Sequence, residues 1–136
     1  MTIFVDASAI VAMIAKEPEA RSFADCLHND PVRIASPLAV WEAVRGVQGA
    51  RALPLTEARG LVADFIAAAK IQVVAVDPSD AELALEAHAR FGKGVDPAAL
   101  NFGDCFAYAV ARRHDAALLF KGDDFAQTDI KDAMLI

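Results

Sequence analysis

The chain begins MTIFVDASAI (residues 1–10), and these residues indicate which kind of sheet it forms. Ile3, Phe4 and Val5 make an apolar run suited to a buried strand, and the run ends at Asp6. An ionised carboxylate at the rim of an apolar sheet loses hydration, so it persists only where another group compensates its charge. We therefore expect the rest of the chain to supply that group.

Short apolar runs alternate with longer helical patterns along the chain, which is typical of an α/β protein. The predicted strands are 2–6, 32–35, 71–76 and 117–120. The predicted helices are 7–15, 19–28, 36–51, 55–70, 77–92 and 103–114. The run IQVVAV at 71–76 is continuous enough to predict a strand buried on both faces. A turn at 121–125 and a final apolar edge at 133–136 are also expected.

Length and composition predict one domain over residues 1–136, because 136 residues at 56% hydrophobic content can bury a single core. The formal net charge of −6 argues against a protein held on nucleic acid mainly by its own net charge. Nucleic acid remains open as a substrate, because a bound metal and a local basic patch reverse the local field. Two cysteines are too few for a disulfide framework, and we expect a cytoplasmic protein with no membrane span.

Acidic residues gather where predicted strands end and helices begin. In an open parallel α/β sheet, ligands bind beyond the carboxyl ends of the strands. Asp6, Asp123 and Asp124 follow such ends. Asp104 lies in the first turn of a predicted helix, where the helix dipole favours negative charge, and Glu42 lies on the helix after the second strand. We expect four separate segments to deliver carboxylates to one edge.

Carboxylates that lie close together raise one another's pKa and take up protons unless a cation stands between them. Mg²⁺ suits such a site, with Mn²⁺ as the alternative, because both prefer oxygen ligands and use few protein carboxylates. His28, His88 and His114 lie in separate helices without ligand-type spacing, so we expect no imidazole site. Asp6 is thus predicted to end its strand because a metal ion stands beyond it.

Each acid also has a structural interpretation. Asp6 could cap the helix that follows it, and Glu42 could pair with Arg45, three residues on. Asp104 could merely favour a helix start, with Asn101 as a cap or turn residue. These alternatives remain open on the residues alone.

Residues near these acids are open to interpretation as well. Asp123 and Asp124 could form only a turn, and for Asp123 the turn is the favoured interpretation. Ser8 either hydrogen-bonds a metal-bound water or a phosphate, or satisfies a local N–H group. Three aromatic residues are predicted to lie in the core and not to stack on bases: Trp41, Phe106 and Phe125.

Four stretches together resemble the PIN-domain nucleases, specifically the VapC-type toxins of toxin–antitoxin pairs. They are VDASAI (5–10), WEAVRG (41–46), LNFGDCFAYAVAR (100–112) and LLFKGDDF (118–125). The resemblance implies a three-layer α/β/α sandwich around a mainly parallel sheet, with a Mg²⁺-dependent ribonuclease site. It implies four catalytic acids, Asp6, Glu42, Asp104 and Asp124, of which Asp6 and Asp104 bind the metal. Asp123 is less certain, because related sequences often carry a neutral polar residue there.

The resemblance also implies partners: an RNA substrate, a second copy of the chain in a homodimer, and a cognate VapB-type antitoxin. The helices at 36–51 and 55–70 carry more Ala, Val and Leu than one sheet face easily covers, which favours a shared apolar surface. An apolar antitoxin segment is expected between these helices, with an arginine that reaches the acids and competes with metal. Arg45 and Lys121 are candidates to hold substrate phosphates.

Other functions share parts of this pattern. A receiver-like signalling domain also binds Mg²⁺ beside a strand-end Asp and uses a late Lys such as Lys121, but it needs an acidic pair after the first strand. A phosphatase of the haloacid dehalogenase type needs Asp-x-Asp, which the sequence Asp6-Ala7-Ser8 does not provide. A catalytically silent PIN scaffold is the third alternative, and the presence of all four acids argues against it.

Overall fold

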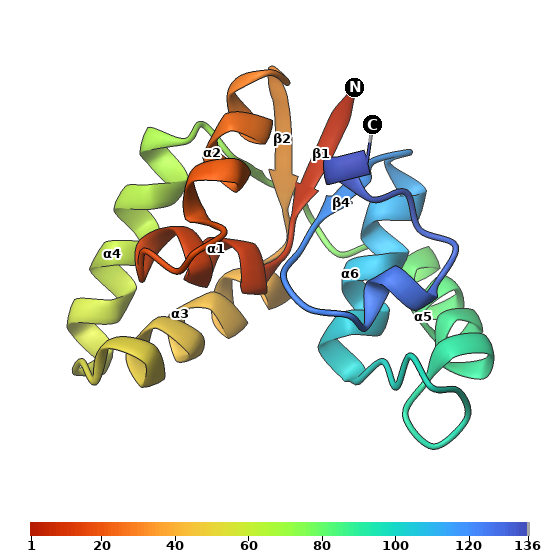
Figure 1. The fold of residues 1–136 in the computed structure, drawn as a ribbon. Coiled ribbons are helices and arrows are strands. Elements are labelled where there is room, and N and C mark those ends of the chain that lie inside the picture. The colour runs from red at the N-terminus through yellow and green to blue at the C-terminus, as the bar shows by residue number, and fades with distance from the viewer. Residues whose placement is uncertain (136) are drawn as a thin grey trace.

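The computed structural model describes residues 1–135 and contains one parallel sheet between two layers of helices (Figure 1). The strands are β1 (Thr2–Val5), β2 (Val32–Ala35), β3 (Gln72–Val73) and β4 (Ala117–Leu119), in the spatial order β3-β2-β1-β4. The central strand β1 pairs Phe4 with Ile34 of β2 on one side and with Leu118 of β4 on the other. The predicted α/β/α sandwich with a parallel sheet is confirmed.

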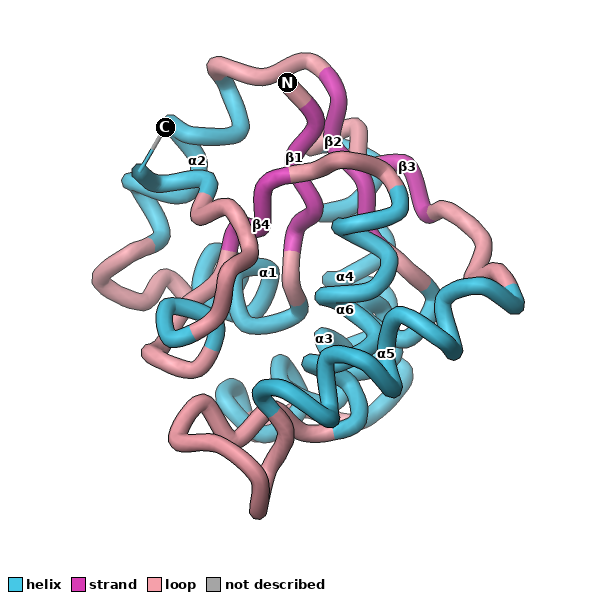
Figure 2. Tube along the Cα trace, turned by 90° about the vertical axis from the view of Figure 1, so that its right-hand side faces the viewer, coloured by secondary structure: helices cyan, strands magenta, loops and turns pink. Residues whose placement is uncertain are grey.

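The helices divide between the two faces of the sheet (Figures 1 and 2). On one face lie α1 (Ala7–Ile14), α2 (Ala20–His28), α3 (Pro37–Arg51) and α4 (Leu55–Ala68). On the other lie α5 (Pro78–Phe91) and α6 (Phe102–Arg113), and the short 3₁₀ helices η1 (Phe125–Gln127) and η2 (Ala133–Leu135) follow β4. Within residues 1–135, no helix combines the length and the apolar character that a membrane crossing requires.

Polar caps begin the helices that start at the carboxyl edge of the sheet. Ser36 Oγ accepts a hydrogen bond from the Ala39 N–H at 3.2 Å, with Pro37 at the first helical position of α3. Asp6 caps α1, and Asn101 caps α6. Such caps satisfy N–H groups that have no partner inside the helix. These helices therefore begin at fixed residues, which places their first turns at one edge of the sheet.

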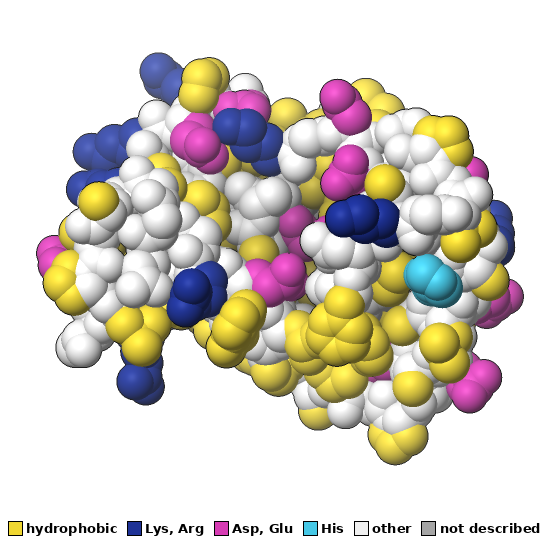
Figure 3. Space-filling view, turned by 90° about the horizontal axis from the view of Figure 1, so that it is seen from below, with side chains coloured by type: hydrophobic (Ala, Val, Ile, Leu, Met, Phe, Trp, Pro, Cys, Tyr) yellow, Lys and Arg dark blue, Asp and Glu magenta, His cyan; other side chains and the backbone are white. Residues whose placement is uncertain are grey.

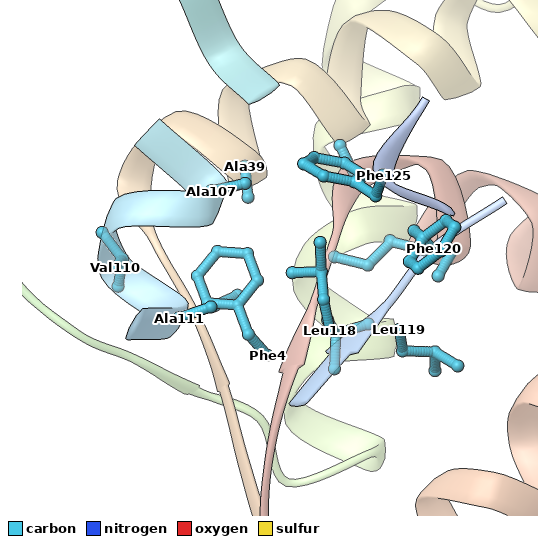
Figure 4. Packing of buried hydrophobic residues seen from close by; sticks show 14 of the residues in the cluster. Phe4, Ala39, Ala107, Val110, Ala111, Leu118, Leu119, Phe120 and Phe125 are labelled. Atoms are coloured by element: carbon cyan, nitrogen blue, oxygen red, sulfur yellow. The ribbon is translucent and has the colours of Figure 1, made fainter. Parts of the chain in front are cut away.

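Part of the core forms where β1 meets α6. The Phe4 side chain is fully buried and lies between β4 and α6, with Ala111 and Val110 on the helix side and Leu118 on the strand side (Figure 4). Burial of one such phenylalanine stabilises the fold by about 1.5–3 kcal/mol. Because alanine is small, α6 approaches the sheet closely, and this brings the first turn of α6 to the end of β1.

The prediction of a strand over 71–76, buried on both faces, is wrong. The observed β3 covers only Gln72–Val73, and both residues are exposed. The strand lies at the sheet edge and pairs with β2 alone, so it has a neighbouring strand on only one side. The chain then leaves the sheet for Asp77, the N-cap of α5. β-branched residues favour a strand but do not distinguish an edge from a centre.

The predicted final apolar edge at 133–136 is also wrong as far as the structure describes it. Residues Ala133–Leu135 form η2, and the preceding residue, Asp132, makes an isolated bridge to Leu118 of β4. Ile136 lies outside the described residues. The three-residue turn gives too few consecutive extended residues for a ladder to form.

Candidate active site

Asp6 lies at the carboxyl end of the central strand and is only 7% exposed. Its N–H donates to the Leu119 carbonyl at 2.9 Å, which extends the β1–β4 pairing to the end of the strand. Its Oδ2 accepts hydrogen bonds from the Ser8 N–H at 3.0 Å and from the Ser8 hydroxyl at 2.5 Å. Burial raises the pKa of the Asp6 carboxyl, although the bonds from Ser8 oppose this. The helix-cap interpretation of Asp6 is therefore correct, and the cap fixes the carboxylate in place.

Ser8 connects Asp6 to the loop after β4. While its hydroxyl donates to Asp6, its Oγ accepts a hydrogen bond from the Lys121 N–H at 3.0 Å. The Ser8 hydroxyl thus satisfies an N–H group, as one interpretation predicted, but that group belongs to Lys121 and is not local in the sequence. The result is that the end of β1, the start of α1 and the loop after β4 are held together at a single hydroxyl.

Glu42 projects from α3 towards the first turn of α6, and its side chain is half-buried. Its carboxylate lies directly against Gly103, where a Cβ atom would stand 2.5 Å from the Glu42 Cδ. Burial, together with the negative charges of Asp6 and Asp104, raises the pKa of Glu42 to about 7. Among the described residues Glu42 forms no ion pair with Arg45, so the surface-pair alternative is wrong.

Asp104 lies in the first turn of α6 within a reciprocal cap. Its N–H donates to Asn101 Oδ1 at 2.9 Å, and its Oδ2 accepts from the Asn101 N–H at 3.1 Å. Burial raises the pKa of Asp104 to about 6, and the charges of Asp6 and Asp124 add to this against the bond from Asn101. The cap interpretations of Asn101 and Asp104 are confirmed, and the cap leaves Asp104 beside other acids.

The two acids after β4 differ in their surroundings, although both are exposed. Asp124 immediately precedes η1, and its charge contributes to the raised pKa of Asp104. The Asp123 carbonyl accepts a hydrogen bond from Gln127 Nε2 at 3.4 Å, which is a contact within the turn. Asp124 is thus related to the other acids through its charge, and Asp123 has a contact within the turn.

Three of the four predicted acids line one hollow of about 510 Å³ at the carboxyl edge of the sheet. Figure 3 looks onto this edge and shows acidic side chains in a central depression beside a hydrophobic area. Asp124 is not among the lining residues. Those residues are Asp6, Ala7, Ser8, Val11, Glu17, Glu42, Gly46, Asp104, Lys121 and Gly122.

The two predicted phosphate-binding residues point to other partners. Lys121 Nζ lies 3.3 Å from Glu17 Oε2 and 3.5 Å from Glu19 Oε2, at the rim of the hollow. The Arg45 guanidinium lies over the Trp41 ring, 6.0 Å from its centroid. The rim residue Glu17 was not predicted, because it follows α1 without any motif. Gly103 was also missed, since a glycine beside an acid gives no signal of which distant side chain it contacts.

The prediction that Trp41 lies in the core is wrong, since 66% of this residue is exposed. Together with Phe102, which is 72% exposed, it borders a groove of about 370 Å³ lined also by Leu38, Glu42 and Gly103. We call this the Trp41–Phe102 groove. The two other aromatic residues behave as predicted or nearly so: Phe125 is buried, and Phe106 is half-buried against Phe102, with ring centroids 5.0 Å apart.

The chemistry of the acids fits a hard divalent cation. Asp6, Glu42 and Asp104 offer carboxylate oxygens, and within residues 1–135 none of them forms an ion pair with Lys or Arg. No group of three or more His, Cys, Asp or Glu side chains in this part of the chain is already arranged to hold a metal ion. Like charges favour separation when no cation lies between them. A cation of two positive charges would favour the ionised carboxylates and so oppose the effect of burial, which is the main cause of the raised pKa values, and the effect of the neighbouring charges.

Fold and hollow together define a PIN-like α/β/α protein. A model of the PIN domain matches residues 3–131. The chain is 40% identical over 139 residues to a VapC ribonuclease of Rhizobium meliloti (strain 1021), which covers 93% of this chain and 98% of that protein. It is 37% identical over 137 residues to ribonuclease VapC30 of Mycobacterium tuberculosis, covering 96% and 98%. The chain belongs to the PIN domain family and, within it, to the VapC ribonucleases.

A solved structure shares the fold. Mycobacterium tuberculosis VapC20, described as a toxin that cleaves the sarcin–ricin loop, superposes with a TM-score of 0.73 over 95% of this chain and 96% of its own. At 18% sequence identity, this likeness concerns the fold alone. Membership of the PIN family excludes the receiver-like alternative.

Proposed function

We propose that this protein is a Mg²⁺-dependent ribonuclease, with residues 1–136 acting as one nuclease domain and as the toxin of a toxin–antitoxin pair. One observation carries the proposal: Asp6, Glu42 and Asp104 come from three separate segments to one hollow without a cationic partner among residues 1–135. Membership of the VapC ribonucleases supports RNA as the substrate. Mn²⁺ is the expected substitute for Mg²⁺.

In this proposal Asp6 and Asp104 hold the cation, and Glu42 and Asp124 complete its surroundings or orient water. Such a cation, when bound, neutralises charge on the scissile phosphate and acidifies water. Ser8 holds the Asp6 carboxylate and Asn101 holds that of Asp104, so neither needs to reorganise before the reaction.

Glu42 is suited to accept a proton from the attacking water. Its carboxylate lines the same hollow as Asp6 and Asp104, which is where a metal-bound water would lie. The net reaction adds water across the phosphodiester bond: the water oxygen bonds to phosphorus, and the bond from phosphorus to the leaving oxygen breaks. Glu42 takes one proton of the water and later releases it to solvent, and the leaving oxygen gains a proton from solvent.

The test is cleavage of RNA by the purified protein in Mg²⁺ and in EDTA, with Asp6→Asn, Glu42→Gln and Asp104→Asn compared. Each variant is expected to lose about 100-fold or more of the activity, because each removes one of few carboxylates. Asp115→Asn is the matched control, because Asp115 is an exposed acid that pairs only weakly with Lys131, at 3.7 Å. Wild-type protein without cleavage would contradict the proposal and favour a silent scaffold. Full cleavage by Asp6→Asn in EDTA would contradict the dependence on a metal ion and on Asp6.

We also propose that a VapB-type antitoxin neutralises the enzyme by covering the Trp41–Phe102 groove. Trp41 on α3 and Phe102 at the start of α6 are among the most exposed large apolar side chains, and both line this groove. We therefore propose docking between α3 and α6 in place of the expected site between α3 and α4. Glu42 lines both this groove and the acidic hollow, so an arginine on a docked segment reaches the acids directly. The net charge of −6 suits such a cationic segment.

Coexpression with the small protein encoded beside this one tests the partners. The complex is expected to have lost RNA cleavage, and the toxin alone is expected to be a homodimer by light scattering. A strict monomer at tens of micromolar would contradict the dimer. Undiminished cleavage in the complex would contradict neutralisation.

A further inference from the structure

The contact between Glu42 on α3 and Gly103 on α6 is unusual in its closeness. A Cβ atom built on Gly103 would overlap both carboxylate oxygens of Glu42 and would stand 2.5 Å from the Cδ, below the 3.0 Å that Cβ contacts in proteins respect. The glycine therefore leaves a space that the Glu42 carboxylate fills. That space lies one residue before Asp104.

The backbone does not require glycine at this position. Gly103 is the second residue of α6, and among the described residues only Gly94 and Gly122 are glycines with a positive φ. Alanine forms helices better than glycine, so local stability alone favours alanine here. A reason for glycine must come from the neighbouring side chain, and Glu42 is that neighbour.

The kind of atom that a Cβ would meet decides what its addition would do. The overlapping atoms belong to the end of a flexible side chain and not to backbone or core. Glu42 can therefore swing away at little cost to the fold, but its carboxylate then leaves its place beside Asp6 and Asp104. A side chain at position 103 would therefore displace the Glu42 carboxylate and leave the rest of the fold in place.

We propose that Gly103 is a positioning residue that keeps the Glu42 carboxylate beside Asp104. The proposal rests on the ribonuclease function proposed above. The proposal predicts that cleavage and folding stability respond differently to a side chain at position 103. Cleavage weakens, whereas the fold keeps or gains stability. A substitution of a core residue would lower both.

The experiment compares Gly103→Ala with Gly49→Ala and Gly60→Ala. The two controls are helical glycines whose added Cβ meets no atom within 4 Å. Gly103→Ala is expected to lose about tenfold or more in kcat, because small misplacements of catalytic groups are costly. Its melting temperature is expected to match or exceed that of wild type, and binding of Mn²⁺, followed by calorimetry without RNA, is expected to weaken severalfold. Both controls are expected to retain wild-type kcat and Mn²⁺ binding.

A second substitution tests the mechanism. Asp is one methylene shorter than Glu, so Glu42→Asp keeps the carboxylate clear of a Cβ at position 103. Glu42→Asp is expected to lower kcat in wild type but to cost clearly less in the Gly103→Ala background, where the two sites are coupled. Strictly additive losses would overturn the proposal.

The outcomes separate the two proposals. If wild type does not cleave RNA, or Asp6→Asn cleaves it equally well, the ribonuclease proposal fails. If wild type cleaves RNA with Mg²⁺ and Gly103→Ala matches Gly49→Ala, only the role of Gly103 is overturned. A Gly103→Ala protein that melts well below wild type also overturns it, because the Cβ then disturbs the fold and not the carboxylate alone.

Discussion

The raised pKa values of single acids in the hollow make folding stability depend on pH. The pKa of Glu42 is about 7 and that of Asp104 about 6, whereas the ordinary values are about 4.3 and about 3.9. Between the ordinary and the raised values the folded chain binds more protons than the unfolded chain. Stability therefore falls as pH rises through this window.

In EDTA, the melting temperature is expected to fall between about pH 5 and pH 8, because protons leave the folded acids there. Glu42→Gln is expected to flatten the fall, since it removes a carboxyl group whose pKa is raised to about 7 by burial and by the charges of Asp6 and Asp104. Excess Mg²⁺ is expected to do the same in wild type. Differential scanning fluorimetry across pH measures this. A melting temperature that rises over this range, or an equal slope in Glu42→Gln, would contradict the prediction.

The two acids after β4 are expected to differ in importance. Asp124→Asn is expected to lower RNA cleavage by about tenfold or more, the usual cost of losing a group that supports a metal site. Asp123→Asn is expected to have a much smaller effect, because the Asp123 contact in the turn is made by its backbone carbonyl. Initial rates of both variants under the same Mg²⁺ concentration measure the difference. Equal losses would count against the assignment of Asp124.

At the scale of elements, a buried ion pair joins the start of α5 to the end of α6. Asp80 is completely buried, and Arg113 donates to it from Nε at 2.7 Å and from Nη2 at 3.0 Å. The same Nη2 donates to the Ala75 carbonyl at 2.9 Å. Removal of the arginine would leave an unpaired buried charge, which costs far more than the loss of a surface pair.

Arg113→Ala is therefore expected to lower the free energy of unfolding by about 3 kcal/mol or more. The neighbouring Arg112 is the matched control, because it pairs with the partly exposed Asp129 at 3.4 Å. Arg112→Ala is expected to cost less than about 1 kcal/mol. Urea unfolding of both variants gives the comparison, and equal costs would show that the Asp80 pair contributes no more than a surface pair.

How well each element could be predicted depends on whether its signal is local. The caps at Ser36 and Asn101 act on residues within one turn, so the sequence predicts the starts of α3 and α6 closely. The edge position of β3 depends on which strands pair, and the β-branched residues at 71–76 do not indicate this pairing. Long-range pairing thus limited the prediction of the sheet.

Trp41 shows a signal that was present but outweighed by residue type. Ala39, Ala43 and Val47 are the buried positions of α3, spaced four residues apart. Trp41 lies two residues from both alanines, about 200° around the helix. The helical period therefore places it on the outer face, while its size favoured a place in the core.

The site could be predicted in part, because some of its signals are local in the sequence and others are not. Motifs at strand ends and helix starts predict that Asp6, Glu42 and Asp104 share an edge, and the structure brings them to one hollow. The space at Gly103 and the ion pair of Glu17 with Lys121 depend on side chains far apart in the sequence. Only the packed structure reveals those contacts.

At the scale of the whole molecule, the single tryptophan reports on partner binding. Trp41 is largely exposed beside the acidic hollow, so a segment that covers the groove removes it from water. Its fluorescence emission is expected to shift to shorter wavelength when the antitoxin binds. Trp41→Ala is expected to weaken that binding about tenfold or more, since exposed aromatic side chains are frequent anchors of interfaces.

Val95→Ala is the matched control for that prediction, because Val95 is an exposed apolar residue in the loop between α5 and α6. Isothermal titration with both variants measures the affinities. An unchanged emission spectrum on complex formation, with equal affinities for the two variants, would place the partner elsewhere on the molecule.

The pairing of β1 with β4 has a consequence for protein synthesis. Val5 pairs with Leu119, more than 100 residues later, and the Asp6 N–H bonds to the Leu119 carbonyl. The central strand is therefore without one neighbour until the ribosome has released β4, and such distant pairings form late in folding. A nascent chain carries Asp6 and Glu42 early, whereas Asp104 and β4 follow only in its last third. We therefore expect RNA cleavage to begin only after synthesis has delivered β4 and β4 has paired with β1.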